Sequence, residues 1–166
     1  MCGIAGAMNI SNDVWFSTDG KTWTSATASA GWPARYGFVV LSFDDKIWVM
    51  GGANMSYQTR NDVWSSADGK TWTQVTASAP WGARERFTGA VIDGKMWIMG
   101  GLSGSNVFND VWSSSDGVEW TRQTGSAAWS ARFSLTAVVH DDHLWIMGGT
   151  NSKGGAGLTD VWRLQK

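Results

Sequence analysis

The tetrapeptide Asn61-Asp62-Val63-Trp64 decides the fold, because the chain repeats it. It occurs also at residues 12–15 and 109–112, and residues 160–162 repeat its last three letters. The tryptophans that end these copies are 49, 48 and 50 residues apart. Self-similarity at a fixed period of this length is typical of repeat architectures, in which each unit is one supersecondary structure. We therefore interpret the chain as a tandem repeat.

Each unit contains four short runs of β-forming residues with turn residues between them. Counted from the arginine of the second copy, these runs are residues 87–92, then 96–99, then 63–66 of the preceding stretch or 111–114 of the following one, and then 120–123. Asp-Gly pairs, which are strong hairpin signals because glycine adopts a positive φ freely, recur at 19–20, 68–69, 93–94 and 116–117. Four antiparallel strands in a unit of about 40 to 50 residues are typical of a propeller blade. The sequence therefore predicts an all-β propeller.

The repeating order of these features resembles the kelch motif, in a tryptophan-rich form of bacterial type. An apolar run ending in Gly-Gly is followed by a loop, by Asn-Asp-Val-Trp, by a Trp-Thr strand and by an arginine. The resemblance covers nearly the whole chain. It implies that the run after the arginine is the innermost strand and that the Trp-Thr run is the outermost. The first Gly-Gly position departs from the motif and reads Ile4-Ala5-Gly6-Ala7, which is a degraded second strand.

Several residue types recur in every unit. We interpret the repeated aspartates and arginines as structural, since a residue present in every unit meets a need of every blade. The tryptophans are expected to fill the space between blades. His140 and His143 lie in a turn whose equivalents in the other units are ordinary solvent turns, so we predict no metal site there.

Residues 1–166 are expected to form one kelch-repeat domain, with units 12–60, 61–108 and 109–159 and partial strands at 1–11 and 160–166. Two complete four-stranded blades and two partial ones amount to about three blades, whereas closed propellers have about four to eight. An open arc exposes strand edges and apolar faces. We therefore predict that the ring is completed by oligomerisation, with a homodimer of six blades first and a ring of eight as the alternative.

Composition narrows the possible partners. A formal net charge of −1 gives no attraction toward nucleic acid or an anionic membrane, and neither partner is expected. The single cysteine excludes an intramolecular disulfide, and no Cys/His pattern indicates a metal. No cofactor is expected.

The absence of a signal peptide favours a cytoplasmic location. No catalytic triad or phosphate loop is found, so the chain is not expected to be an enzyme.

The loops after the Gly-Gly pairs differ between units and are the best candidates for ligand contacts. They share a face with the segments that enter the innermost strands. The resemblance implies that this face holds the ligand and that the second residue after the arginine points at the channel mouth, which selects Arg86 and Ser134. The full set of predicted ligand-binding residues is Tyr36, Asn54, Tyr57, Glu85, Arg86, Asn106, Ser134 and Asn151.

Three functions remain open on the sequence alone. The first is a non-enzymatic scaffold that binds a protein or peptide and assembles with itself. The second is a glycan-binding or carbohydrate-active domain, although no carboxylate pair for glycoside hydrolysis is identifiable. The third is a propeller fragment or a designed repeat with no evolved ligand.

Overall fold

The computed structural model describes residues 9–164, which form strands and no helix. The strands are β1 Val14–Phe16, β2 Thr24–Thr27, β3 Val39–Phe43, β4 Lys46–Ala53, β5 Thr59–Ser66, β6 Thr73–Thr76, β7 Thr88–Ile92, β8 Lys95–Met99, β9 Leu102–Ser103, β10 Asn106–Val107, β11 Val111–Ser114, β12 Thr121–Thr124, β13 Thr136–His140, β14 His143–Met147 and β15 Val161–Arg163. Within this range there is no helix that could cross a membrane. The all-β prediction is confirmed.

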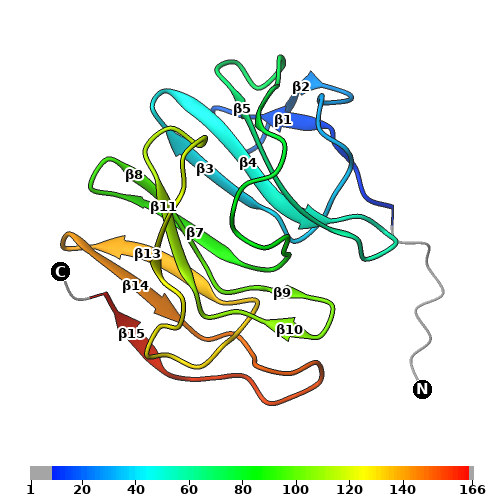
Figure 1. Cartoon of the computed structure of the whole chain (residues 1–166). Coiled ribbons are helices and arrows are strands. Elements are labelled where there is room, and N and C mark those ends of the chain that lie inside the picture. Colours follow the sequence, from blue (N-terminus) through cyan, green and yellow to red (C-terminus); the bar gives the residue numbers. More distant parts are fainter. Residues whose placement is uncertain (1–8, 165–166) are drawn as a thin grey trace.

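Four of the five antiparallel sheets in the described residues are fanned side by side, and the fifth is the short β9–β10 hairpin (Figure 1). The first full blade has the strand order β3-β4-β5-β6, and the second full blade has the order β7-β8-β11-β12. The N-terminal half-blade consists of β1 and β2, and the C-terminal partial blade consists of β13, β14 and β15. The innermost strands β3, β7 and β13 contact one another in that order. The described chain is therefore an arc of a propeller, with the strand order that the repeat predicts.

Aspartate-rich turns close the hairpins between first and second strands. Asp93 and Gly94 have φ values of 51° and 64°, as a two-residue hairpin turn requires. The equivalent positions in the other blades are Asp-Asp pairs at 44–45 and 141–142, also with positive φ. Aspartate tolerates this left-handed conformation better than most residues. The hairpin predicted at 93–94 is thus confirmed.

A different turn joins the third strand to the fourth. The Asp68 carboxylate accepts hydrogen bonds from the backbone N–H groups of Lys70 and Thr71, each 2.8 Å long. The Ser66 hydroxyl accepts one from the Gly69 N–H, also 2.8 Å long. The hydrogen bonds that the Asp68 carboxylate accepts, led by those from Thr71 and Lys70, lower the pKa of Asp68 to about 2. The turn is therefore held by an ionised aspartate.

The core lies between neighbouring blades and repeats with them. Between the two full blades, Trp81 is fully buried and Trp120 meets it edge-on, with ring centroids 5.8 Å apart. The cluster around them contains Trp48, Met50, Val63, Phe87, Met96 and Ile98. Trp15 and Trp23 differ, because they lie at the end of the arc and are exposed. For these two the prediction of a buried packing role is wrong within this single chain.

The strand boundaries differ slightly from the predicted ones. β7 begins one residue later than expected, β12 is shifted by one residue, and β5 begins four residues before Val63. The loop after Gly101 contains a short hairpin, β9–β10, that the sequence analysis does not predict. The degraded second strand expected at residues 4–7 lies outside the described residues.

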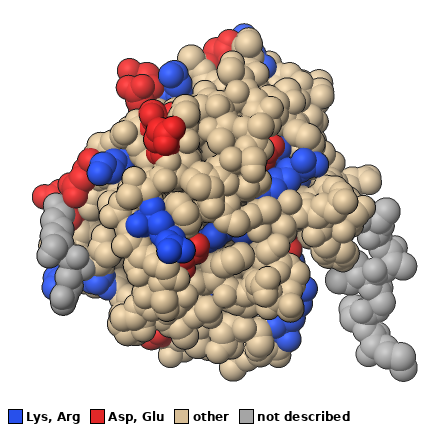
Figure 2. All heavy atoms as spheres, in the orientation of Figure 1, with Lys and Arg blue, Asp and Glu red and all other residues tan. Residues whose placement is uncertain are grey.

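Charged side chains are spread thinly over the surface. On the face that Figure 2 shows, basic and acidic residues are separated by large uncharged areas, and in several places they lie next to each other. This distribution agrees with the net charge of −1. It gives this face no extended region of one sign.

Candidate functional site

Three short segments lead into the innermost strands, and we call the surface that they form the mouth. They are residues 36–37, 85–86 and 133–134. The first residue of each bridges to the residue that follows a Gly-Gly pair: Tyr36 to Ala53, Glu85 to Leu102 and Phe133 to Thr150. The structure therefore brings the entering segments and the variable loops together, as the sequence analysis expects.

The second residues of these segments form a rim of backbone hydrogen bonds. The Arg86 N–H donates to the Gly37 carbonyl, and the Ser134 N–H donates to the Arg86 carbonyl, each at 2.7 Å. The three residues have φ values of 62°, 53° and 55°. Arg86 and Ser134 thus hold a left-handed conformation that costs a non-glycine residue roughly 1–2 kcal/mol. Strained backbone of this kind is common where ligands bind.

The Gly-Gly pairs allow the blades to approach each other behind this rim. The Gly101 N–H donates to the Arg132 carbonyl of the next blade at 2.8 Å. A Cβ on Gly100, which has a φ of 68°, would lie 2.8 Å from the Arg132 carbonyl oxygen of the next blade, and a Cβ on Gly101, which has a φ of 96°, would lie 2.8 Å from the Glu85 carbonyl oxygen of its own blade. No side chain fits at either position, so the recurrence of glycine reflects a backbone requirement.

The repeated arginines and aspartates form bidentate ion pairs inside each blade. The pairs are Arg35–Asp62, Arg84–Asp110 and Arg132–Asp160. Burial raises the pKa of Asp110, but the hydrogen bonds from Arg84 and Trp112 outweigh it and hold the pKa below its ordinary value. Arg84 also donates to the Gly100 carbonyl at 3.0 Å. The repeated charges therefore tie each mouth segment to its own blade and are not free to bind a ligand.

Two buried polar atoms at the mouth have no hydrogen-bond partner among the described residues. They are Oε2 of Glu85 and the hydroxyl of Tyr36. Burial raises the pKa of Tyr36, and the charge of Glu85 adds to the effect. The Arg86 Nε lies 3.6 Å from Oε2 of Glu85. Glu85 thus carries its charge behind Arg86, and neither of the two buried atoms lies in the surface that a ligand contacts.

Two hollows lie at the mouth. The first, of about 570 Å³, is lined by Tyr57, Arg86, Phe133, Ser134, Thr150, Ser152, Lys153 and Gly154. The second, of about 420 Å³, shares Phe133, Ser152 and Lys153 with it and adds Asn151. Four predicted residues thus line one hollow or the other. Lys153 and Ser152 were missed, and the length of the third variable loop was the signal that could have found them.

The remaining predicted residues lie outside the linings of these hollows. Tyr36 and Glu85 form the buried pair described above. The Asn54 side chain accepts hydrogen bonds from the N–H groups of Ser56 and Gln58 and so shapes its own loop. Asn106 is exposed in the β9–β10 hairpin.

The described residues contain no group of three or more His, Cys, Asp or Glu side chains that could hold a metal ion. His140 and His143 face each other across the β13–β14 turn, and His140 lies 3.5 Å from Asp141. The mouth offers cationic, hydroxyl and aromatic groups, which suit binding.

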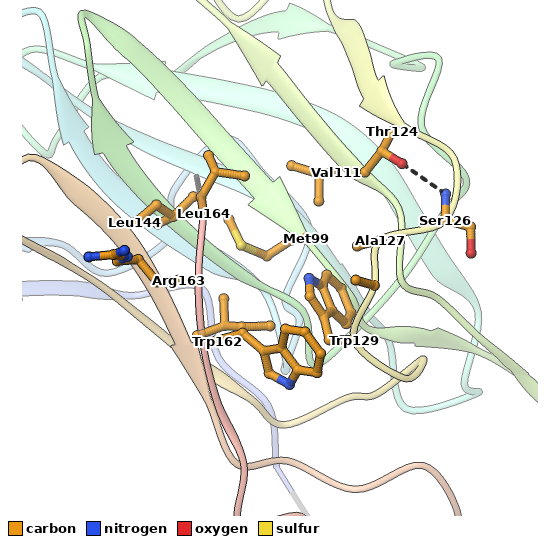
Figure 3. Close-up of a pocket in the computed structure, with 12 residues that line it drawn as sticks. Met99, Val111, Thr124, Ser126, Ala127, Trp129, Leu144, Trp162, Arg163 and Leu164 are labelled. Carbon is orange, nitrogen blue, oxygen red and sulfur yellow. Dashed lines mark hydrogen bonds between the residues drawn. The ribbon is translucent and has the colours of Figure 1, made fainter. Parts of the chain in front are cut away.

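A further cavity, of about 500 Å³, lies at the C-terminal end of the arc (Figure 3). Met99, Val111 and the rings of Trp129 and Trp162 border it (Figure 3). A second cavity of about 350 Å³ shares Val111 and Trp129 with it. The sequence analysis does not predict this apolar groove, although the repeat contains the signal, because Trp129 has no later Trp-Thr strand to pack against it.

Comparison with known families gives the same result as the geometry. The model for the KLHDC2/KLHL20/DRC7 Kelch-repeats domain matches residues 3–166. No curated protein matches the chain. Domains with kelch repeats are generally interaction modules that bind other proteins. Because the match spans almost the full length, the chain belongs to the kelch-repeat family, and its structure is a partial kelch propeller.

Proposed function

We propose that the chain is a non-enzymatic scaffold that binds an acidic peptide segment of a partner protein at the mouth. The observation that carries this proposal is the first mouth hollow, where two cationic side chains, Arg86 and Lys153, stand beside the hydroxyls of Ser134 and Ser152. Guanidinium and ammonium groups form charge-assisted hydrogen bonds with carboxylates, and the hydroxyls add neutral ones.

The neighbouring groups favour a peptide over a small anion. The Tyr57 ring is exposed at the edge of the hollow and offers an apolar surface with a polar tip. Glu85 is buried behind Arg86, and its Oε2 attracts the Arg86 Nε by charge at 3.6 Å. The Arg86 side chain remains 44% exposed. A peptide can contact the cations, the ring and the backbone of the rim together.

Selection from a random-peptide phage library on the immobilised protein tests this proposal. We expect enriched peptides to be rich in Asp and Glu, to bind less tightly as salt is raised, and to lose at least about tenfold in affinity on Arg86→Ala. Arg122→Ala is the matched control, since Arg122 is an exposed arginine on β12. Enrichment without acidic residues, or peptides that bind Arg86→Ala equally well, would overturn the proposal. A glycan-array signal lost on Arg86→Ala would assign the mouth to carbohydrate instead.

The scaffold is completed, in this proposal, by a second copy of the chain. Twelve large hydrophobic side chains are exposed among the described residues. Nine of them lie at the two ends of the arc: Trp15, Phe16, Trp23, Val40, Ile47, Val138, Val139, Val161 and Leu164. Exposed apolar residues gathered in this way mark an interaction surface. Their position supports closure of the ring end to end.

Light scattering at micromolar concentration tests self-association. The expected mass is about twice the 18.0 kDa of one chain. A folded protein that keeps a mass of 18.0 kDa over the whole concentration range would refute it.

A further inference from the structure

The cavity beside Trp129 corresponds to the space beside Trp81 that Trp120 fills one unit earlier. Trp81, the counterpart of Trp129, is met edge-on by Trp120. The residues around Trp120 include Met50, Val63, Ala79, Met96 and Ile98. Their counterparts Met99, Val111, Ala127, Leu144 and Ile146 line the cavity (Figure 3). Trp162 borders this cavity as the counterpart of Trp112, but none of the described residues is a counterpart of Trp120 at this place.

At the other end of the arc, Trp23 is a tryptophan that has no such space to fill within the described part of its own chain. Trp23 stands just before β2, as Trp120 stands just before β12, and it is 58% exposed where Trp120 is 7% exposed. Trp72, the counterpart in the first full blade, is packed edge-on against Trp32 at 5.8 Å. The two ends of the arc are therefore complementary at this position.

A second contact between blades shows the same complementarity. Trp48 packs on the turn at Gly117 so closely that a Cβ on that glycine would enter the indole ring. If a second copy followed the C-terminal blade, the counterparts of Trp48 and Gly117 at that junction would be Trp97 of the first chain and Gly20 of the second copy. Trp97 is half-buried, and the space around Gly20 is open, with nothing within 4 Å of a Cβ placed there. A turn carrying Gly20 fits on Trp97.

The half-blade also carries a carboxylate that is not paired with an arginine among the described residues. Asp13 occupies the position of Asp62 and Asp110, but its described partners are Ser11 and the Trp15 indole instead of an arginine. At the other end, Asp160, the residue before β15, pairs with Arg132, although its side chain remains 41% exposed. Val161 of β15 is 58% exposed, whereas its counterpart Val63 is fully buried. β15 is thus a loosely covered third strand.

From these relationships we propose that the C-terminal groove receives the β1–β2 hairpin of a second copy, which displaces β15. Trp23 of the second copy fills the cavity beside Trp129, and its Asp13 replaces Asp160 on Arg132. β1 pairs with β14, so the hairpin supplies the third and fourth strands together. The exchange forms one ion pair and breaks one, and it adds an outer strand and the burial of Trp23.

This inference rests on the proposed self-association and specifies which parts meet. Each chain contributes two full blades, and each of the two junctions forms one more. The ring then has six blades, within the range of closed propellers. In the alternative of eight, β15 stays in place and the facing edges of β1 and β15 remain unpaired at each junction.

Sedimentation equilibrium of two aspartate variants separates these arrangements. We expect Asp13→Asn to raise the dimer dissociation constant at least about tenfold, because it weakens the incoming ion pair. We expect Asp160→Asn to lower it about tenfold, because it weakens the strand that must leave. If both variants behave like the wild type, or both weaken the dimer, the exchange is wrong while self-association stands. A monomeric wild type overturns both.

A pair of glycine variants tests the contact itself. Gly20→Ala should weaken the dimer at least about tenfold, because the methyl group would meet the partner's Trp97. Gly104→Ala is the matched control, since Gly104 also has a positive φ and nothing within 4 Å of a Cβ, and it lies in the β9–β10 turn at the mouth. Near-UV circular dichroism of both variants checks the fold. Equal dimerisation of the two would contradict the docking geometry.

Discussion

The guanidinium of Arg84 donates two hydrogen bonds to the carboxylate of Asp110, 2.6 and 2.9 Å long, across 26 residues of chain. The arginine side chain is fully buried. The pair connects the segment that enters the second full blade to the start of that blade's third strand. Removal of one partner leaves a buried charge without compensation, which is far more costly than the pair is worth.

Asp110→Asn should therefore destabilise the protein by about 3–5 kcal/mol. The same substitution at Asp160 should cost less, because Asp160 is more exposed and water can replace part of the interaction. Urea denaturation of both variants at equal protein concentration measures the difference. Equal losses at the two sites would show that burial does not set the strength of these pairs.

The contrast between Gly101 and Arg86 gives a second test. Gly101→Ala places a methyl group 2.8 Å from the Glu85 carbonyl and 2.6 Å from the Phe87 Cβ, so the segment that enters β7 must move away from the Gly-Gly turn of its own blade. We expect a loss above about 3 kcal/mol, beyond the roughly 1–2 kcal/mol of backbone strain alone. Arg86→Ala should stay within about 0.5 kcal/mol of the wild type. Thermal melts of the two variants measure these losses of stability. A large loss of stability in Arg86→Ala would show that Arg86 has a structural role.

Two equivalent tryptophans should differ in importance. Trp81→Ala removes a fully buried ring in contact with Trp120 and should cost about 3–5 kcal/mol. Trp129→Ala should cost less in the monomer, because one side of that ring borders the open cavity. Guanidinium denaturation at low protein concentration tests the order. The reverse order would mean that the cavity is closed in solution.

Acid should weaken the turns that follow the third strands. The pKa of Asp68 is lowered to about 2 from an ordinary value of 3.8. Its contribution to stability is therefore complete above pH 3.8 and is lost progressively as the pH falls toward 2. Asp68→Asn keeps the hydrogen-bond acceptor but does not titrate, so its stability should change less over this interval. Denaturation at pH 5, 3.5 and 2.5 shows whether the two profiles converge.

The repeating positions could be predicted because a period gives every copy the same surroundings. Trp81 and Trp120 pack as the repeat indicates, and Asp93-Gly94 makes the turn that its residues demand. Trp23 has the same sequence context as Trp120, yet it is exposed, because burial depends on the next blade and the end of an arc has none.

Positions outside the repeat were harder to predict. Lys153 joins the mouth because its loop is long enough to reach Ser134, which no periodic pattern expresses. The β9–β10 hairpin arises in a loop where Gly104 has a φ of 62°. Local chain geometry, and not the repeat, determines these parts of the site.

At the rim of residues 37, 86 and 134, the backbone and the side chains have separate roles. Its hydrogen bonds use only main-chain atoms, and its three side chains are a hydrogen, a guanidinium group and a hydroxymethyl group. Each blade consequently presents one side chain at the axis, while main-chain hydrogen bonds keep the register of the neighbours fixed. A propeller built in this way can change its specificity one residue at a time, and tandem duplication supplies further such positions without a change of fold.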